Sequence, residues 1–429
     1  MENPTIGVVG CGTIGQSIAR VCAAAGLRTV LFKLTDEQNI EELHIKFQAG
    51  LQTEADLPNS KLTKEAHLNI LGNLSWSRWT DRVHNIKDCD ALIECAPEKL
   101  DIKQRVFREM DVLAKYEAIL ASSTSSLSIM ELARATRSTD RVMGFHPFNP
   151  FKAMKLVELA RTTRTSAETL EKGRALALRL GKTPIVVGDT PGFIVNRLLI
   201  PYLLDAIRCY ENGPASKEDI DSAVELGYGF PMGPLKLADL IGLDVLLAIA
   251  MSLYDSCQDK FQNKRFAPPE LLKSLVARGM LGKKTKIGLY DYAAARGTPV
   301  VNDLVSSFIA DHLLIPYFLD AIRCYKNGLA SVEDIDLAMK LGCGLPEGPL
   351  EMSDEMGLGV ILARANHVYG DLKDECFAPP LLLQRLVQEK MFGSKGEKKL
   401  GFYDYNTTES KRPNLKLPEI LDFDKRFAW

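Results

Sequence analysis

The sequence predicts an α/β domain with a parallel sheet, followed by two copies of an all-α module. Short β-rich runs alternate with amphipathic segments up to about residue 186, and beyond it a helical segment occurs twice. With 46% hydrophobic and 25% charged residues, the 429-residue chain has the composition of ordinary globular domains. We therefore expect domains at residues 1–186, 187–297 and 298–429.

The strands of the first domain are expected as short apolar runs. TIGVVG (5–10) predicts a strand, IGQSIARVCAAAG (14–26) a helix, and RTVLFK (28–33) a second strand. Further strand candidates are DALIECA (90–96), EAILASS (117–123), RVMGFH (141–146), MKLVELA (154–160) and TPIVVGD (183–189). The polar stretch from Asp36 to His67 indicates helical segments whose bounds the pattern does not define.

The helical part contains an internal duplication. Residues 197–228 align without gaps to residues 312–343, and 23 of 32 positions are identical. The similarity continues to IGLYDY (287–292) and LGFYDY (400–405), and the Pro- and Gly-containing linker RGTPVVND (296–303) separates the copies. Shared helical periodicity does not produce such identity, so we interpret the two segments as copies of one module.

A glycine-rich turn predicts a dinucleotide site in the first domain. The run G-C-G-T-I-G at residues 10–15 follows a predicted strand and opens a predicted helix, the context that this motif requires. We expect Gly10, Gly12, Thr13, Ile14 and Gly15 to surround the cofactor's phosphates at the helix N-terminus, as in a Rossmann fold. The alternative is a glycine turn without a ligand.

Lys33 leaves the choice of dinucleotide open. It lies at the end of the second strand, near the place where a carboxylate usually binds the ribose of NAD. A lysine cannot accept hydrogen bonds from ribose hydroxyls, but with Thr35 it can bind the 2′-phosphate of NADP. Two alternatives remain: Asp36 takes the role of the acid, or Lys33 is a solvated surface residue.

Charge and cysteine usage exclude several classes of protein. The net charge of −2 gives no indication of nucleic-acid or membrane binding, and no apolar run approaches the length of a membrane span. The nine cysteines are dispersed without a CxxC pair, which favours a reducing compartment over a disulfide framework. We expect a cytoplasmic protein without a secretory signal or a metal site.

His146 and Glu158 are the candidate catalytic pair. His146 is one of six histidines and ends a predicted strand beside the irregular loop PFNPF, while Glu158 follows on the next strand. Oxidation of an alcohol carbon requires a base for the hydroxyl proton, and a carboxylate bonded to the other ring nitrogen fixes the tautomer. The alternatives are a structural histidine and a surface carboxylate.

Four ordered motifs, together with the glycine run, closely resemble the L-3-hydroxyacyl-CoA dehydrogenase family. They are IECAPEKLDIKQRVF (93–107), ASSTSSLSI (121–129), GFHPFNPFKAMKLVEL (144–159) and GDTPGFIVNRLL (188–199). The resemblance covers nearly the whole chain. It implies a Rossmann-type domain, helical domains like the C-terminal domain of 6-phosphogluconate dehydrogenase, and a role in fatty acid metabolism.

The resemblance also implies roles for single residues. Ser125 and Asn196 would contact the reacting oxygen, Asn149 would lie near substrate and nicotinamide, and Glu98 and Lys103 would hold the nicotinamide-side ribose. For Ser125, the alternative is that its segment caps a helix, since Ser128 and Glu131 fit a capping box. For Asn149 the alternative is an Asn-Pro turn, and for Glu98 and Lys103 it is a charged pair on a solvated helix start.

The sequence departs from the family pattern at a few positions. Ser123 stands where the family commonly has Asn, and the second helical copy has Asp311 at the position of Asn196. The second copy also has no Rossmann domain of its own. We therefore expect it to be structural and to take the place of a dimer partner, giving a monomer or a loose oligomer.

These observations predict an NAD(P)-dependent dehydrogenase of 3-hydroxyacyl thioesters, with coenzyme A as the acyl carrier, His146 as general base and Glu158 as its orienter. NADP is favoured over NAD because of Lys33. The alternatives are an acyl-carrier-protein thioester, a free hydroxy acid or sugar acid, and a catalytically silent structural relative.

Overall fold

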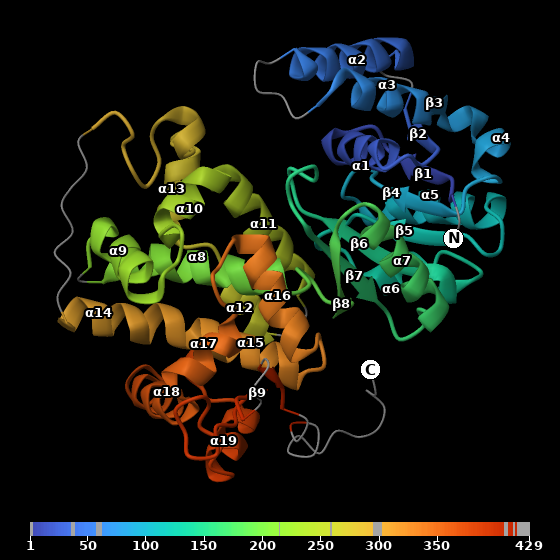
Figure 1. Ribbon diagram of the computed structural model, residues 1–429. Coiled ribbons are helices and arrows are strands. Elements are labelled where there is room, and N and C mark those ends of the chain that lie inside the picture. The colour runs from blue at the N-terminus through green and yellow to red at the C-terminus, as the bar shows by residue number, and fades with distance from the viewer. Residues whose placement is uncertain are drawn as a thin grey trace. The chain divides into compact units, whose positions relative to one another are not determined.

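The computed structural model describes residues 3–35, 39–56, 62–213, 215–257, 260–294, 303–406, 411–414 and 417, with backbone alone at 260–262 and 303–304. The chain divides into two compact units, Met1–Thr190 and Pro191–Trp429 (Figure 1). Both helical copies therefore belong to one unit. Our division of the chain at residues 186 and 297 stays a prediction.

Within the described residues, the first unit is built on an eight-stranded sheet with the order β3-β2-β1-β4-β5-β6-β7-β8. The strands are β1 (Ile6–Val9), β2 (Thr29–Lys33), β3 (Leu74–Arg78), β4 (Ala91–Glu94), β5 (Ile119–Ser122), β6 (Val142–Pro147), β7 (Leu156–Arg161) and β8 (Thr183–Gly188). Seven of them coincide with the expected runs, although β6 and β7 each extend one residue past the expected end. The sequence analysis missed β3, in which only Leu74 and Ser77 are buried, so the strand gives a weak apolar signal.

The sheet is not wholly parallel, so the predicted parallel sheet needs a correction. Strands β6 and β7 run antiparallel, while β7 and β8 are parallel to each other. Only residues 148–155 connect β6 to β7. A parallel pair needs a crossover of about a dozen residues or more, so this short loop forces the reversal. The reversal sets the register that forms the candidate catalytic pair.

Helices flank the sheet: α1 (Thr13–Ala24), α2 (Ile40–Ala55), α3 (Lys64–Asn73), α4 (Arg82–Ile86), α5 (Leu100–Leu113), α6 (Ile129–Ala133) and α7 (Ala167–Arg179). The segment in which we expected helices without defined bounds contains α2 and the start of α3. Helix α1 presents Ile18, Ala19 and Cys22 to the core, at the spacing of one helical face, against Ile6 and Val8 of β1.

The second unit contains the two helical copies. The first comprises α8 (Val195–Asn212), α9 (Lys217–Tyr228), α10 (Pro234–Ile241), α11 (Leu243–Ser256), α12 (Lys260–Phe266) and α13 (Glu270–Ala277). The second comprises α14 (Asp303–Ile309), a π-helical turn (Ala310–Leu314), α15 (Ile315–Lys326), α16 (Val332–Cys343), α17 (Pro349–Met356), α18 (Leu358–Leu372) and α19 (Leu381–Gln388). Two short strands, β9 (Tyr403–Asp404) and β10 (Arg412–Pro413), follow.

Equivalent buried aspartates anchor both copies. Asp221 accepts hydrogen bonds from the Leu235 amide at 2.8 Å and from the Tyr290 hydroxyl at 2.8 Å. Asp336 accepts the equivalent bonds from Leu350 at 2.8 Å and Tyr403 at 2.7 Å. The repeated sequence therefore encodes a repeated set of tertiary contacts, as expected for a duplicated module.

The two copies are joined by a buried ion triad. Arg265 of the first copy lies 2.7 Å from Asp205 in α8 and 2.9 Å from Asp320 in α15, and all three side chains are at least nine-tenths buried. Burial alone would lower the pKa of Arg265, but the two carboxylates raise it well above its ordinary value. In the second copy, Cys376 stands at the position of Arg265, so the triad occurs once in the described residues.

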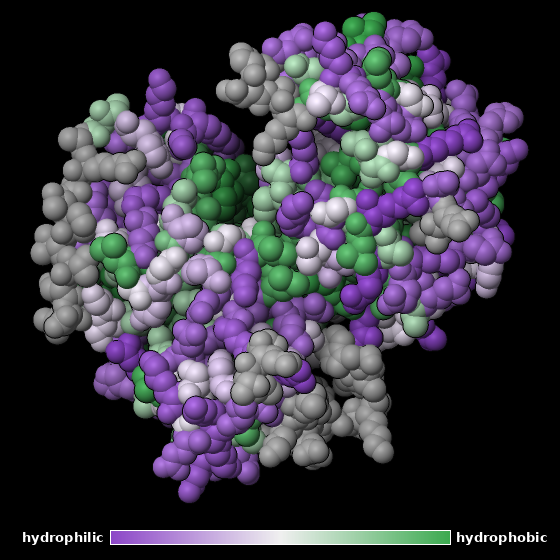
Figure 2. All heavy atoms as spheres, in the orientation of Figure 1, coloured by the Kyte–Doolittle hydropathy of each residue, from purple (hydrophilic) through white to green (hydrophobic). Residues whose placement is uncertain are grey.

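One helical stretch meets a composition test for a membrane span, and one face of the helical unit is apolar. Of the described helices, the stretch Val305–Lys326 passes a length and composition test for a membrane span, although we expected no such run. Its apolar window is 67% buried inside the protein, as is typical of a core helix. Apolar side chains also gather over α10 and α11 (Figure 2), where Leu240, Val245 and Met251 are exposed.

Candidate active site

The glycine turn between β1 and α1 has the geometry of a phosphate-binding loop. Gly10 has a φ of +118°, and a Cβ there would lie 2.4 Å from the carbonyl oxygen of Cys95. A Cβ at Gly15 would lie 1.8 Å from the Gly10 carbonyl oxygen, so only glycine lets the helix approach the turn. A Cβ at Gly12 would meet nothing within 4 Å, and no side chain caps the helix. The amides of the first turn, including Thr13 and Ile14, can therefore face a phosphate group.

Lys33, the last residue of β2, is buried rather than solvated. Its side chain is 5% exposed, and its ammonium donates to the carbonyl oxygen of Thr35. Val9 of β1 pairs with Phe32 of β2, and the Gly10 amide donates to the Phe32 carbonyl oxygen at 2.9 Å, which places Lys33 beside the turn. The solvated-surface alternative is therefore wrong. Asp36, the other alternative, lies outside the described residues.

Lys103 is at the centre of a network of buried charges. The Lys103 ammonium is 1% exposed and lies 2.8 Å from Oε1 of Glu94 and 3.2 Å from Oε2 of Glu98. Burial alone would raise the pKa of Glu98, but Lys103 and hydrogen bonds from Thr124 and Ser126 lower it. The solvated-pair alternative for Glu98 and Lys103 is wrong, since Lys103 is buried. Lys103 contacts Glu98, and its predicted cofactor contact stays a prediction.

The serine loop after β5 is tied to this network. Oε1 of Glu98 accepts hydrogen bonds from the Thr124 hydroxyl, the Ser126 hydroxyl at 3.1 Å and the Ser125 amide at 3.3 Å. The Ser122 hydroxyl donates to Glu94 at 2.7 Å. Ser125 itself is partly exposed, so its hydroxyl can meet a ligand. The sequence analysis missed Glu94, whose signal was a carboxylate at the end of a fully apolar strand.

Two side chains cap the short helix that follows. Ser128 accepts from the Glu131 amide at 3.3 Å, as the capping motif predicts. Asp189 adds a cap that the sequence analysis missed: it accepts from the Ile129 amide at 2.7 Å and the Met130 amide at 2.8 Å. Asp189 thereby fixes the far end of the loop that carries Ser125. The N-cap and the ligand contact are therefore compatible within this segment.

His146 and Glu158 form a buried pair. The antiparallel register of β6 and β7 places them directly opposite each other, and Nδ1 of His146 lies 2.7 Å from Oε2 of Glu158. Glu158 is fully buried and His146 is 6% exposed. The edge-on ring of Phe148 lies 4.8 Å from the His146 ring. The surface-carboxylate alternative for Glu158 is wrong, because the side chain has no exposed area.

Lys182 binds the loop that follows His146 through hydrogen bonds to backbone carbonyl groups. Lys182 is 6% exposed and donates to the carbonyl oxygens of Phe151 and, at 2.9 Å, Met154. Burial lowers its pKa, and Lys155 adds to this shift. Asn149 lies at the exposed tip of the loop, before a cis peptide bond to Pro150. An Asn-Pro turn and a ligand contact are both compatible with this position.

The predicted site residues fall into two groups. The glycine turn, Glu98 and the Ser125 loop follow the carboxyl ends of β1, β4 and β5, where ligands bind in open α/β sheets, and His146 lies near the carboxyl end of the adjacent β6. Asn196 belongs to the second unit. It is the second residue of α8 and is partly exposed on a mostly buried helix.

Comparison with known proteins agrees with this geometry. The family model described as 3-hydroxyacyl-CoA dehydrogenase, NAD binding domain, matches residues 5–190. The model of the C-terminal domain of the same family matches twice, at residues 192–292 and 308–405. The chain belongs to the 3-hydroxyacyl-CoA dehydrogenase family. It is therefore an oxidoreductase that uses a nicotinamide dinucleotide and acts on 3-hydroxyacyl-CoA.

Relatives fall into a shorter and a longer type. A 3-hydroxybutyryl-CoA dehydrogenase of Clostridioides difficile is 40% identical over 287 residues, covering 67% of this chain and 99% of that protein. A 3-hydroxyadipyl-CoA dehydrogenase of Escherichia coli K12 is 31% identical over 481 residues, covering 91% and 99%. A solved 3-hydroxybutyryl-CoA dehydrogenase from E. coli K12 aligns with a TM-score of 0.79 and 29% identity, covering 91% and 99%.

The family membership fits the residues described above. The uncapped turn at Gly12 and the buried lysine beside it suit an anionic dinucleotide. The catalytically silent alternative and the free hydroxy-acid alternative are not favoured by these relatives. Among the described residues, no group of three or more His, Cys, Asp or Glu side chains could hold a metal ion.

Proposed function

We propose that this protein oxidises 3-hydroxyacyl-CoA thioesters, with His146 as general base and Glu158 as the residue that orients it. The observation that supports these roles is the 2.7 Å contact between Nδ1 of His146 and the fully buried Glu158 carboxylate. A bound nicotinamide dinucleotide would accept the hydride from the substrate's C3 carbon. Side chains of this protein transfer the proton and bind the reacting oxygen.

His146 transfers the proton of the substrate's 3-hydroxyl group in both directions of the reaction. Because Nδ1 is bonded to the Glu158 carboxylate, the neutral ring carries its proton on Nδ1 and presents a lone pair at Nε2. Nε2 then removes the proton of the substrate's 3-hydroxyl group, and Glu158 stabilises the imidazolium that forms. In the direction of reduction, the same imidazolium returns the proton to the 3-oxo oxygen.

Polar neutral groups hold the reacting oxygen. We assign this role to the hydroxyl of Ser125 and the amide of Asn196, which donate hydrogen bonds without changing the charge of the site. The hydrogen bonds of Glu98 to the serine loop, and the Asp189 cap, support a fixed position for Ser125. Asn149, exposed at the loop tip, is assigned to the nicotinamide side.

We propose that the cofactor site accepts the phosphorylated dinucleotide. Lys33 supports this because its charge is kept beside the glycine turn, where the adenine-side ribose is expected. Titration with NADH and NADPH, followed by quenching of protein fluorescence, measures the preference. A clear preference for NADH in the wild type, unchanged in Lys33→Ala, would contradict this part of the proposal.

Coenzyme A is the proposed acyl carrier, and the cytoplasm the proposed location. The relatives named as acyl-CoA dehydrogenases favour coenzyme A.

The second helical copy is proposed to replace a dimer partner, leaving a monomer or a loose oligomer. The triad of Arg265 with Asp205 and Asp320 supports this, as does the packing of Tyr202 against Tyr317, equivalent residues with ring centroids 5.3 Å apart. Light scattering across a range of concentrations tests it. A tight dimer at the lowest concentration measured would contradict it.

The main experiment is oxidation of 3-hydroxybutyryl-CoA with each cofactor, by wild type and His146→Gln. We expect turnover by the wild type and a loss of at least a thousandfold in kcat for the variant, with an unchanged melting temperature. Activity that survives the substitution would remove His146 from its role. A free 3-hydroxybutyrate arm separates thioester from free-acid chemistry.

A further inference from the structure

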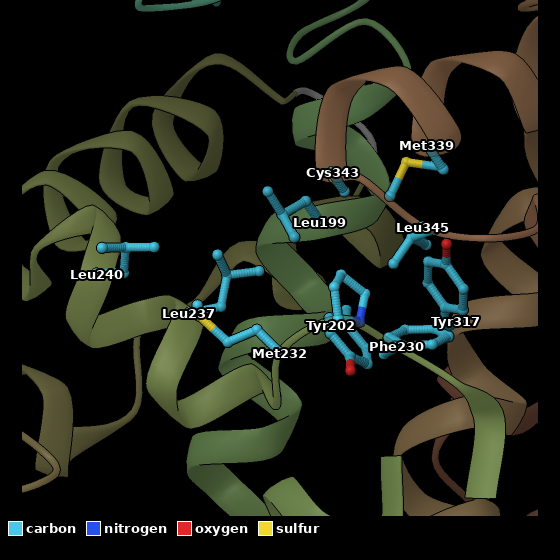
Figure 3. A pocket seen from close by; sticks show the side chains of 11 residues that line it. Leu199, Tyr202, Phe230, Met232, Leu237, Leu240, Tyr317, Met339, Cys343 and Leu345 are labelled. Atoms are coloured by element: carbon cyan, nitrogen blue, oxygen red, sulfur yellow. The ribbon is translucent and has the colours of Figure 1, made fainter. Parts of the chain in front are cut away.

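A cavity of about 200 Å³ lies between the two helical copies, and its walls are apolar (Figure 3). The first copy contributes Leu199 and Tyr202 of α8, with Met232 beside them. The second copy contributes Tyr317 of α15, with Met339 and Cys343 of α16. Leu240 of α10 also lines it and is 48% exposed, so the cavity adjoins the apolar face over α10 and α11.

The cavity begins on the face of α8 that carries Asn196. Asn196 and Leu199 are both partly exposed, whereas the residues between and around them are buried. Positions three apart share one face of a helix, so Leu199 lies next to Asn196, about 4.5 Å farther along the axis, and Tyr202 follows Leu199 about a further 60° around the helix. A substrate whose oxygen contacts Asn196 can therefore extend its carbon chain along α8 into the cavity.

The two copies differ at this cavity. At the positions of Met232 and Leu240, the second copy has Glu347 and Glu355. At the position of Cys343, the first copy has the larger Tyr228. Burial, together with Glu355, raises the pKa of Glu347, which places two carboxylates side by side where the first copy is apolar.

The position of Asn196 itself also differs between the copies. It is taken by Asp311, which lies 3.2 Å from Arg364. The apolar side chains that the first copy contributes to the cavity thus belong to the copy that has the proposed catalytic amide.

The chemistry of the walls defines the ligand. A cavity of about 150 Å³ with apolar walls holds a benzene molecule, so this one has room for a short alkyl chain. No lysine, arginine or histidine lines it among the described residues, and burying an unpaired carboxylate there would be costly. Burial and the nearby Asp221 raise the pKa of Tyr202 well above its ordinary value, so its phenol stays neutral.

We propose that this cavity holds the end of the substrate's acyl chain, and that Tyr317, Met339 and Cys343 of the second copy limit its length and require it to be uncharged. The second copy is then a specificity determinant as well as a structural partner. This inference rests on the proposed function, in particular on the role of Asn196. It specifies the substrates as 3-hydroxyacyl thioesters with short, saturated, uncharged chains.

Three thioesters test the proposal on the wild type: 3-hydroxybutyryl-CoA, 3-hydroxyhexanoyl-CoA and 3-hydroxyadipyl-CoA. We expect kcat/KM for the hexanoyl thioester to exceed that for the butyryl thioester by about tenfold or more, since each added methylene enters an apolar pocket. The adipyl thioester has the same chain length but ends in a carboxylate. We expect it to be at least about tenfold poorer than the hexanoyl thioester.

Variants of the second copy test the wall itself. Cys343→Tyr introduces the residue that the first copy has at the equivalent position, and it should lower kcat/KM for the hexanoyl thioester about tenfold while leaving the butyryl value within about twofold. Met339→Ala should shift the preference toward the octanoyl thioester. Leu289→Phe, which exchanges another buried position between the copies outside the cavity, is the matched control and should change no preference.

The outcomes distinguish a failure of this inference from a failure of the proposed function. Active variants that keep the wild-type chain-length profile would overturn the inference and leave the proposed function intact. A wild type that prefers the adipyl thioester would also overturn it. A folded wild type that oxidises none of the thioesters would remove the proposed function and the inference together. If Cys343→Tyr does not fold, Met339→Ala and the wild-type comparison still decide.

Discussion

Glu158→Gln isolates the contribution of one buried charge to catalysis. Glutamine has nearly the same shape as glutamate and can still accept the hydrogen bond from Nδ1 of His146, at 2.7 Å in the wild type. The geometry of the pair is therefore kept while the negative charge is lost. The charge matters when the imidazolium forms, so we expect the loss in kcat with little change in KM.

The size of the expected loss in kcat follows from the burial of Glu158. Glu158 is fully buried, so solvent does not screen its interaction with the imidazolium. At an effective dielectric constant of about 20, unit charges about 4 Å apart attract by about 4 kcal/mol. Each 1.36 kcal/mol of barrier is a factor of ten, so kcat should fall by about a thousandfold. Steady-state oxidation of 3-hydroxybutyryl-CoA at saturating cofactor measures it.

Asp111→Asn is the matched control for Glu158→Gln. Asp111 is also a buried carboxylate of the first unit, bonded to Arg141 at 2.8 Å, and it has no proposed catalytic role. We expect Asp111→Asn to lower stability while leaving kcat within about twofold. A loss in kcat below tenfold for Glu158→Gln, or an equal loss for both variants, would refute the assignment of Glu158.

Three further variants test other parts of the structure. Gly12→Ala should fold normally, because its Cβ meets nothing within 4 Å, yet bind dinucleotide at least tenfold more weakly in fluorescence titration. Lys182→Met leaves two loop carbonyls without their buried donor and should cost about 1–3 kcal/mol in urea unfolding, with faster amide exchange in residues 148–155. Arg265→Leu should cost about 1.5–3 kcal/mol, because Asp205 and Asp320 lose their shared partner while each keeps its ion pair with Arg208 or Arg323, and an unchanged midpoint would contradict this.

Much of the fold was predictable because its signals are local. The glycine turn, the alternating strands and the duplicated module each depend on residues near one another in the chain. The His146–Glu158 contact was also within reach, since consecutive strands commonly pair and twelve residues separate the two side chains. The reversal of β7 was predictable in principle from its short connection but was not predicted.

Other parts of the site depend on contacts between distant segments. Glu94, Asp189 and Lys182 have no motif of their own, and their roles appear only when strands and loops remote in sequence come together. The structure shows that Lys33 and Lys103 are buried, whereas the sequence alone left open that both are solvated surface residues. The burial of a lysine depends on what packs over it, and no local pattern records that.

The sequence by itself indicated the family through the motifs that it shares with it, and the cofactor class through the glycine turn. It also supplied the proposed catalytic pair, because the chemistry of single side chains can be read without the fold. The cavity between the helical copies was decided by tertiary structure alone. Its walls come from two segments about 115 residues apart, and apolar residues on buried helices look alike in sequence whether they fill a core or line a pocket. Packing between the copies is what leaves that space open.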